Sequence, residues 1–298
     1  MNMAKFNGFI QIMRPLNVLV CALSVFSGGL LGEKPMERLS GFFPSFETGL
    51  DSWAARLLCA SVSASLILAA GNVLNDVCDL DTDRINTPYR PLPAKILSRT
   101  EAIVFAALLA FIGLLLAVPL GVMGTIIALS AVLILLFYDL KLKRVPLAGN
   151  LAVAFLGGLA FTYGGIAGFS PLQSLVPAMF AFLFHLGREL VKDAADISGD
   201  SLSGIRTAAT IWGVRISLFL SGLVFAVLAV FVVLPAVILW FGRGYLVIIA
   251  IGVWPVLIHV MISSLRNPSQ DNLRRLARLL KLDMPIGIIA VLAGFQGW

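Results

Sequence analysis

The sequence predicts an all-α fold, a polytopic membrane bundle of about nine transmembrane helices built from two pseudo-repeated four-helix halves plus one helix. Three observations predict this class. Only 13% of the 298 residues are charged and 59% are hydrophobic, whereas soluble domains carry about 25% charged residues. Apolar runs recur along the whole chain, and many approach the roughly 20 residues that cross a bilayer. An acidic motif also occurs twice, at equivalent places in the two halves.

Nine apolar runs are the candidate spans, and Lys and Arg residues concentrate between them. In chain order they cover residues 16–32, 54–76, 100–118, 120–138, 147–167, 172–191, 215–238, 243–264 and 282–297. We expect a single domain over residues 1–298. One repeat would cover approximately residues 10–145 and the second approximately residues 146–265.

Basic residues fix the expected orientation of the bundle. If successive spans alternate in direction, all but four of the 22 Lys and Arg residues fall on one side of the membrane. Because Lys- and Arg-rich loops stay in the cytoplasm, the sequence predicts a multi-pass protein of the cell membrane with a cytoplasmic N-terminus. The net charge of +6 follows from these loops, so it does not indicate nucleic-acid binding. Membrane lipids are the expected neighbours, and we infer no obligate protein partner.

Half of the 16 acidic residues follow the second and the sixth predicted spans. Each place holds three aspartates at positions i, i+3 and i+7, with one more polar side chain four residues earlier. These residues are Asn72, Asp76, Asp79 and Asp83 at the first place and Glu189, Asp193, Asp196 and Asp200 at the second. Matching members are 117 residues apart. An offset of four spans makes this a parallel repeat, so both acidic groups face the same compartment, which we predict to be the cytoplasm.

Helical spacing makes each acidic group a candidate cation site. In a helix, positions i, i+3 and i+7 share one face, which Asn75 joins and from which Asp81 points away. A solvated acidic loop explains any single aspartate, but it does not explain the repeated spacing. Three like charges repel one another, and bound cations relieve that repulsion. Carboxylate oxygens favour Mg²⁺, which bridges carboxylates to substrate phosphates.

Several basic residues are candidates for binding a phosphate group beside these carboxylates. They are Arg84 and Arg90 in the loop after the second span, Lys141 after the fourth and Lys192 within the second acidic segment. Membrane topology alone accounts for Lys and Arg residues at such positions, and for Lys143 and Arg144 it is the preferred interpretation. We therefore expect Lys141, rather than Lys143, to face the acidic groups.

With these residues in view, the whole chain resembles the UbiA-type intramembrane prenyltransferases. The first family motif, N-D-x-x-D-x-x-x-D, is matched by Asn75, Asp76, Asp79 and Asp83, and the second, D-x-x-x-D, by Asp196 and Asp200. The resemblance implies Mg²⁺ ions held by the five aspartates of the two motifs. It further implies an isoprenyl diphosphate substrate, whose pyrophosphate leaves with help from the metals and the basic residues. Together with Asp193, those aspartates are the expected catalytic residues.

Two further stretches resemble the digeranylgeranylglyceryl phosphate synthase branch of that family. They are "RELVKDAADISGD" at residues 188–200 and "IMRPLNVLVCALSVFSGGLLG" near the start, which contains Arg14 and Asn17. The resemblance implies transfer of a geranylgeranyl group to the hydroxyl of geranylgeranylglyceryl phosphate. Other branches prenylate aromatic quinone-precursor or chlorophyll-type acceptors, and these remain alternatives. A transporter is the alternative from another class, although transporter sites lie near the bilayer midplane rather than at helix ends.

Overall fold

The computed structural model describes residues 3–31, 53–238 and 241–294. Within these ranges every long element is a helix, which confirms the all-α prediction. The first half holds α1 (Met3–Ile12), α2 (Pro15–Leu30), α3 (Trp53–Cys78), α4 (Leu80–Asn86), α5 (Arg99–Ala117) and α6 (Gly121–Leu140). The second half begins with α7 (Ala148–Ala167) and α8 (Pro171–Leu202), followed by α9 (Ala208–Trp212), α10 (Val214–Phe231) and α11 (Leu234–Val237). It ends with α12 (Arg243–Ile248), α13 (Trp254–Arg266) and α14 (Gln270–Gly294).

Membrane insertion follows from the length and the surface of these helices. Six helical segments in the described ranges are long and apolar enough to cross a bilayer, or seven if the bent pair α1–α2 counts as one span. Large apolar side chains on the outer faces are exposed, including Val104, Leu108 and Phe111 on α5. A surface of this kind suits lipid rather than water. The chain is therefore an integral membrane protein, whereas the count of about nine spans stays a prediction.

The bend between α1 and α2 occurs at Arg14. The two helix axes meet at 47°, and the backbone of Arg14 has a φ of 57° and a ψ of 71°. This left-handed conformation is uncommon for a residue that carries a Cβ. It lets the chain turn directly into α2, which begins at Pro15, a residue suited to the first position of a helix.

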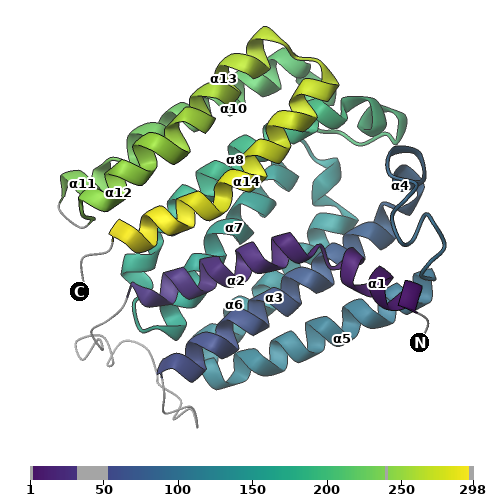
Figure 1. Cartoon of the computed structure of the whole chain (residues 1–298). Coiled ribbons are helices and arrows are strands. Elements are labelled where there is room, and N and C mark those ends of the chain that lie inside the picture. The colour runs from purple at the N-terminus through teal and green to yellow at the C-terminus, as the bar shows by residue number, and fades with distance from the viewer. Residues whose placement is uncertain (1–2, 32–52, 239–240, 295–298) are drawn as a thin grey trace.

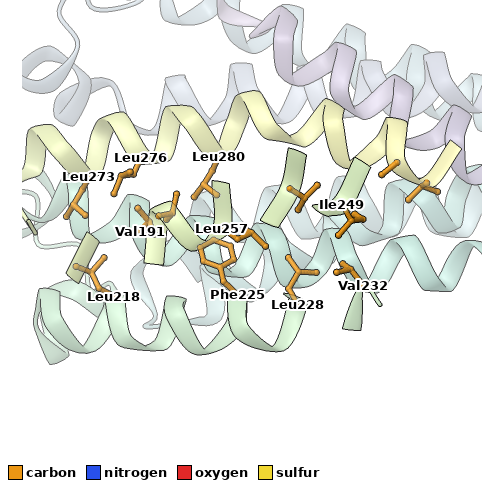
Figure 2. Packing of buried hydrophobic residues seen from close by; sticks show 14 of the residues in the cluster. Val191, Leu218, Phe225, Leu228, Val232, Ile249, Leu257, Leu273, Leu276 and Leu280 are labelled. Atoms are coloured by element: carbon orange, nitrogen blue, oxygen red, sulfur yellow. The ribbon is translucent and has the colours of Figure 1, made fainter. Parts of the chain in front are cut away.

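Helix α14 begins earlier than the sequence suggested. The expected connection over residues 265–281 is helical from Gln270 onward. Leu273, Leu276 and Leu280 are buried and point into a core shared with α8, α10 and α13 (Figure 2). Their spacing of three and four residues is that of one helical face. The Arg residues between them remain on the outer face, which is why the segment looked like a basic loop.

Helices α2 and α7 touch along their backbones. A Cβ on Gly28 would collide with the carbonyl oxygen of Phe161, and one on Gly164 would collide with that of Val25. Small residues allow membrane helices to approach this closely. In Figure 1, α2 also runs beside α14. Helix α2 therefore packs against both α7 and α14, which come much later in the sequence.

Candidate active site

The first acidic group sits where α3 gives way to α4. Asp76 lies in the last turn of α3, Asp79 lies between the two helices, and Asp83 lies in α4. The expected single helix is therefore interrupted at Asp79. The amide N–H groups of Asp79 and Asp83 still donate to the carbonyl oxygens four residues earlier, each over 2.8 Å. These hydrogen bonds preserve the helical spacing that the sequence predicted.

Two arginines bind the carboxylates of this group. Arg90 lies 2.7 Å from an oxygen of Asp83 and 3.4 Å from one of Asp76. Arg14 donates to the same Asp76 oxygen over 2.5 Å and to the Asn75 side-chain oxygen over 3.0 Å. Burial lowers the pKa of Arg90, but Asp76 and Asp83 more than offset this, and the pKa of its guanidinium is raised. Arg90 therefore remains charged beside the two carboxylates.

Lys143 is the third cation at the first acidic group. Its ammonium lies 2.5 Å from Asp79 and 3.7 Å from Asp139, and its side chain is only 9% exposed. Helix α6 ends at Leu140, and a short 3₁₀ turn over Leu142–Arg144 brings Lys143 back over the helix end. Lys141 is exposed and forms no ion pair in the part of the chain that the structure describes. The expectation that Lys141 rather than Lys143 faces the aspartates was wrong.

Arg84 is not brought to the acidic groups, contrary to expectation. It pairs instead with Asp81 over 2.8 Å, and the two side chains are 59% and 91% exposed. Helix α4 turns these two residues, three positions apart, outward on the same face. Asp81 thus lies away from the other aspartates, on the side that the helical spacing predicted.

The second acidic group lies on the continuous helix α8. Asp193 accepts a hydrogen bond from Asn150 over 2.8 Å. The carboxylates of Asp196 and Asp200 have no hydrogen-bond or ion-pair partner among the described residues. Acidic side chains beside apolar helices are costly when unpaired, so these two carboxylates are the ones left to bind a cation.

Glu189 lies one helical turn before Asp193 on α8. Glu189 is buried and pairs with Arg188 over 2.7 Å and with Lys192 over 3.2 Å. Lys192 therefore occupies the second acidic segment, as expected, but its nearest partner is Glu189. The negative charge of Asp196 also attracts the Lys192 ammonium, although Lys192 forms its ion pair with Glu189.

The two acidic groups meet at the same end of the bundle. The hydroxyls of Thr82 in α4 and Ser203, just after α8, lie 3.0 Å apart. The negative charges of Asp79 and Asp200 also repel each other, which requires the two carboxylates to be near each other. The two acidic groups thus lie close to each other at one end of the bundle, where α4 packs against α8.

Two predicted side chains and one that was not predicted remain to be placed. Asn72 is buried and donates to the Met13 carbonyl oxygen over 2.9 Å, so it ties α3 to the start of α2. Asn17 lies half-buried on α2. Asp139, which was not among the predicted site residues, accepts from the Asn75 amide over 2.8 Å. Its place directly after the predicted fourth span and four residues before Lys143 was the available signal.

The carboxylates suit a hard cation, although they are not gathered around one point. No group of three His, Cys, Asp or Glu side chains within the described ranges lies close enough to hold a metal ion. Asp79 is engaged by Lys143 and Asn75 instead. The unpaired Asp196 and Asp200 offer the oxygen ligands that Mg²⁺ prefers. A metal ion joining both acidic groups would therefore compete with Lys143 for Asp79.

Two apolar cavities lie deeper in the bundle. The first, called here the α8–α14 cavity, is bounded by α2, α7, α8, α10, α12 and α14, and its wall includes Phe161, Phe184, Leu228 and Ile288. The second, called the α3–α6 cavity, lies between α2, α3, α6 and α7. Both are suited to hydrocarbon chains. On α3 and α8 the lining residues precede the acidic residues in sequence. Both cavities therefore lie deeper in the bundle than the end that carries the acidic groups.

Known proteins are similar to this chain in both sequence and fold. The model of the UbiA prenyltransferase family matches residues 45–282. A digeranylgeranylglyceryl phosphate synthase from Saccharolobus solfataricus is 32% identical over 293 residues, which covers 97% of each chain. A solved structure of a digeranylgeranylglyceryl phosphate synthase superposes with a TM-score of 0.73 at 28% identity, over 98% of this chain and 99% of that one. A UbiA homologue from Archaeoglobus fulgidus, solved with GPP and Mg²⁺, has the same fold with a TM-score of 0.63 at 17% identity, over 96% of this chain and 99% of that one.

Proposed function

The chain belongs to the UbiA prenyltransferase family, and from that premise we propose that it transfers a geranylgeranyl group to the hydroxyl of geranylgeranylglyceryl phosphate. The similar proteins named as digeranylgeranylglyceryl phosphate synthases support this choice of donor and acceptor. In the reaction, the bond between the allylic carbon and the diphosphate oxygen breaks. The acceptor hydroxyl oxygen then forms the new ether bond to that carbon and loses its proton, and pyrophosphate is released.

The facing acidic groups carry the proposal. Asp79 and Asp200 come from different halves of the chain and act on one another, while Arg14, Arg90 and Lys143 surround the first group. These cations would stabilise the charge that develops on the departing diphosphate. Mg²⁺, when bound by Asp76, Asp79, Asp83, Asp196 and Asp200, would add Lewis-acid stabilisation of the same charge. Each cation is already held in place by a carboxylate.

The membrane placement suits a lipid reaction. The apolar cavities below the charged end would accept hydrocarbon chains and keep water from the cationic carbon. We propose a cytoplasmic position for this end, because Lys and Arg residues concentrate in the connections on that side. We also propose nine spans in one domain with two repeated halves. The 42-residue segment Arg99–Leu140 supports this count, since it is about twice the length that crosses a bilayer and breaks at Gly121, where φ is 87°.

The test is a transfer assay with purified protein in lipid. Labelled geranylgeranyl diphosphate is supplied with geranylgeranylglyceryl phosphate, or with an aromatic quinone precursor, and both the lipid product and the released pyrophosphate are measured. We expect a doubly geranylgeranylated glyceryl phosphate and one pyrophosphate per product, both lost on addition of EDTA and restored by Mg²⁺. Product formed only with the aromatic acceptor would contradict the proposed acceptor. Flux of a solute without pyrophosphate release would contradict the enzyme itself.

A further inference from the structure

Three helices that bound the α8–α14 cavity each carry a cation just beyond their lining residues. Helix α2 lines the cavity with Val20 and Ser24, and Arg14 stands before them at its start. On α8 the lining includes His185, and Arg188 follows three residues later. The same arrangement holds on α14, where Lys281 stands two residues before the lining residue Asp283. The cations lie on the side of the cavity that leads to the acidic groups.

Two of these cations, Arg14 and Arg188, lie near enough to Lys281 to repel it. Helix α14 packs against both α2 and α8, and the charges of Arg188 and Arg14 both repel the Lys281 ammonium. Arg14 is already bound to Asp76. Lys281 is half-buried and has no ion-pair or hydrogen-bond partner in the described part of the chain. Arg14 and Arg188 are held by Asp76 and Glu189, so among these three cations Lys281 is the one left to pair with an incoming anion.

Arg188 adds an independent sign of a ligand. One of its terminal nitrogens donates to Glu189 over 2.7 Å, and its side chain is only 18% exposed. Its Nε is fully buried without a hydrogen-bond partner among the described residues. Buried N–H donors are nearly always paired, and guanidinium groups bind phosphate oxygens with two parallel hydrogen bonds. A phosphate oxygen would satisfy this donor.

Building on the proposed function, we propose that Arg188 and Lys281 bind the phosphate group of the lipid acceptor, with its hydrocarbon chain in the α8–α14 cavity. This phosphate site is separate from the diphosphate site around Asp79, Arg90 and Lys143. A phosphate monoester carries a charge of about −1.5 to −2 at neutral pH, which suits both the Lys281 ammonium and the Nε–H of Arg188, each unpaired among the described residues. Holding the phosphate there also directs the neighbouring glycerol hydroxyl toward the second acidic group on the same helix.

The experiment compares two acceptors, geranylgeranylglyceryl phosphate and geranylgeranylglycerol, which lacks the phosphate. Four proteins are assayed in the same lipid: the wild type, Lys281→Gln, Lys281→Arg and the control Arg278→Gln. Arg278 lies on the same helix and is exposed. Among the described residues its side chain donates only to the Arg274 carbonyl oxygen of its own helix. The KM for each acceptor and for geranylgeranyl diphosphate is measured, along with kcat.

We expect Lys281→Gln to raise the KM for the phosphorylated acceptor roughly tenfold, the usual effect of losing one charge-assisted hydrogen bond. The KM for geranylgeranyl diphosphate and for geranylgeranylglycerol should not change, Lys281→Arg should restore most of the loss, and the control should match the wild type. Equal changes for both acceptors, or no change for the phosphorylated one, would overturn the site.

A second measurement requires no variant. The wild-type KM for the phosphorylated acceptor should rise with ionic strength, because salt screens the contact, while the KM for geranylgeranylglycerol stays constant. Identical salt responses of the two acceptors would also overturn the site. The two proposals fail differently. If the wild type forms product with neither acceptor, the proposed function itself is wrong, whereas an active wild type with an unaffected Lys281→Gln variant removes only the phosphate site.

Discussion

Replacing Lys143 by glutamine removes the cation that lies between Asp79 and Asp139. The Lys143 side chain is 9% exposed and that of Asp139 only 1%, so water replaces little of the lost interaction. Removing one partner of a buried ion pair costs about 3–5 kcal/mol. Because the Asp79 side chain is 25% exposed, solvent screens part of this charge, and we expect the free energy of unfolding to fall by about 2–3 kcal/mol.

The same substitution should also slow the reaction. Lys143 is one of three cations beside the first acidic group, where the diphosphate is proposed to leave. Loss of one such stabilising group typically lowers kcat by about 10²–10³. The matched control is Lys141→Gln, which removes an exposed cation two residues away. It should leave the free energy of unfolding nearly unchanged and keep kcat within about twofold of the wild type.

The assay pairs thermal unfolding in detergent with single-turnover prenyl transfer. Adding Asp79→Asn to Lys143→Gln removes one unpaired carboxylate, so this double variant should regain part of the stability but none of the activity. Separating the two readouts shows whether Lys143 acts only through folding. The reasoning is refuted if Lys141→Gln is as harmful as Lys143→Gln in both measurements.

Two further predictions concern other parts of the molecule. Asp196→Ala should lower prenyl transfer by at least about 10³-fold while the protein still inserts and unfolds normally, because its carboxylate is a proposed metal ligand. Asp81→Ala, assayed beside it, should remain within about threefold of the wild type since its side chain is exposed, and equal losses would contradict the assignment of the site face. Gly164→Leu should prevent α2 from packing on α7, because its side chain would meet the Val25 carbonyl oxygen. We expect about 3 kcal/mol of lost stability or no folded protein in detergent extracts, and a normal melting temperature would disprove the close contact.

Local spacing explains why much of the site could be predicted. The positions of Asp76, Asp79 and Asp83 repeat 117 residues later, and such a repeat is visible without any tertiary information. Hydropathy also locates the long helices, because apolar runs of this length are typical of helices that span a bilayer. The sequence therefore predicted which two segments meet at one end of the bundle, and the structure places Asp79 and Asp200 within reach of each other's charge.

Side-chain direction at helix ends could not be predicted in the same way. Lys141 and Lys143 differ by two positions, and only the 3₁₀ turn after Leu140 decides which one faces Asp79. Periodic patterns stop where a helix stops, so they carry no information about such turns. The missed start of α14 is different, because the spacing of its buried leucines was present in the sequence but was hidden by the arginines between them.

The backbone of Arg14 has a consequence for the evolution of this protein. Glycine would adopt a φ of 57° without strain, whereas a residue with a Cβ pays about 1–3 kcal/mol there. Only the guanidinium, however, can reach both Asp76 and Asn75. An Arg14→Gly chain would thus relax its main chain while losing a charge at the catalytic mouth. Relief of that strain is outweighed by the loss of the guanidinium from the Asp76 carboxylate, which is only 4% exposed, since breaking a buried ion pair costs about 3–5 kcal/mol. At this position stability and turnover therefore depend on the same side chain, and selection for either one retains the arginine despite its backbone.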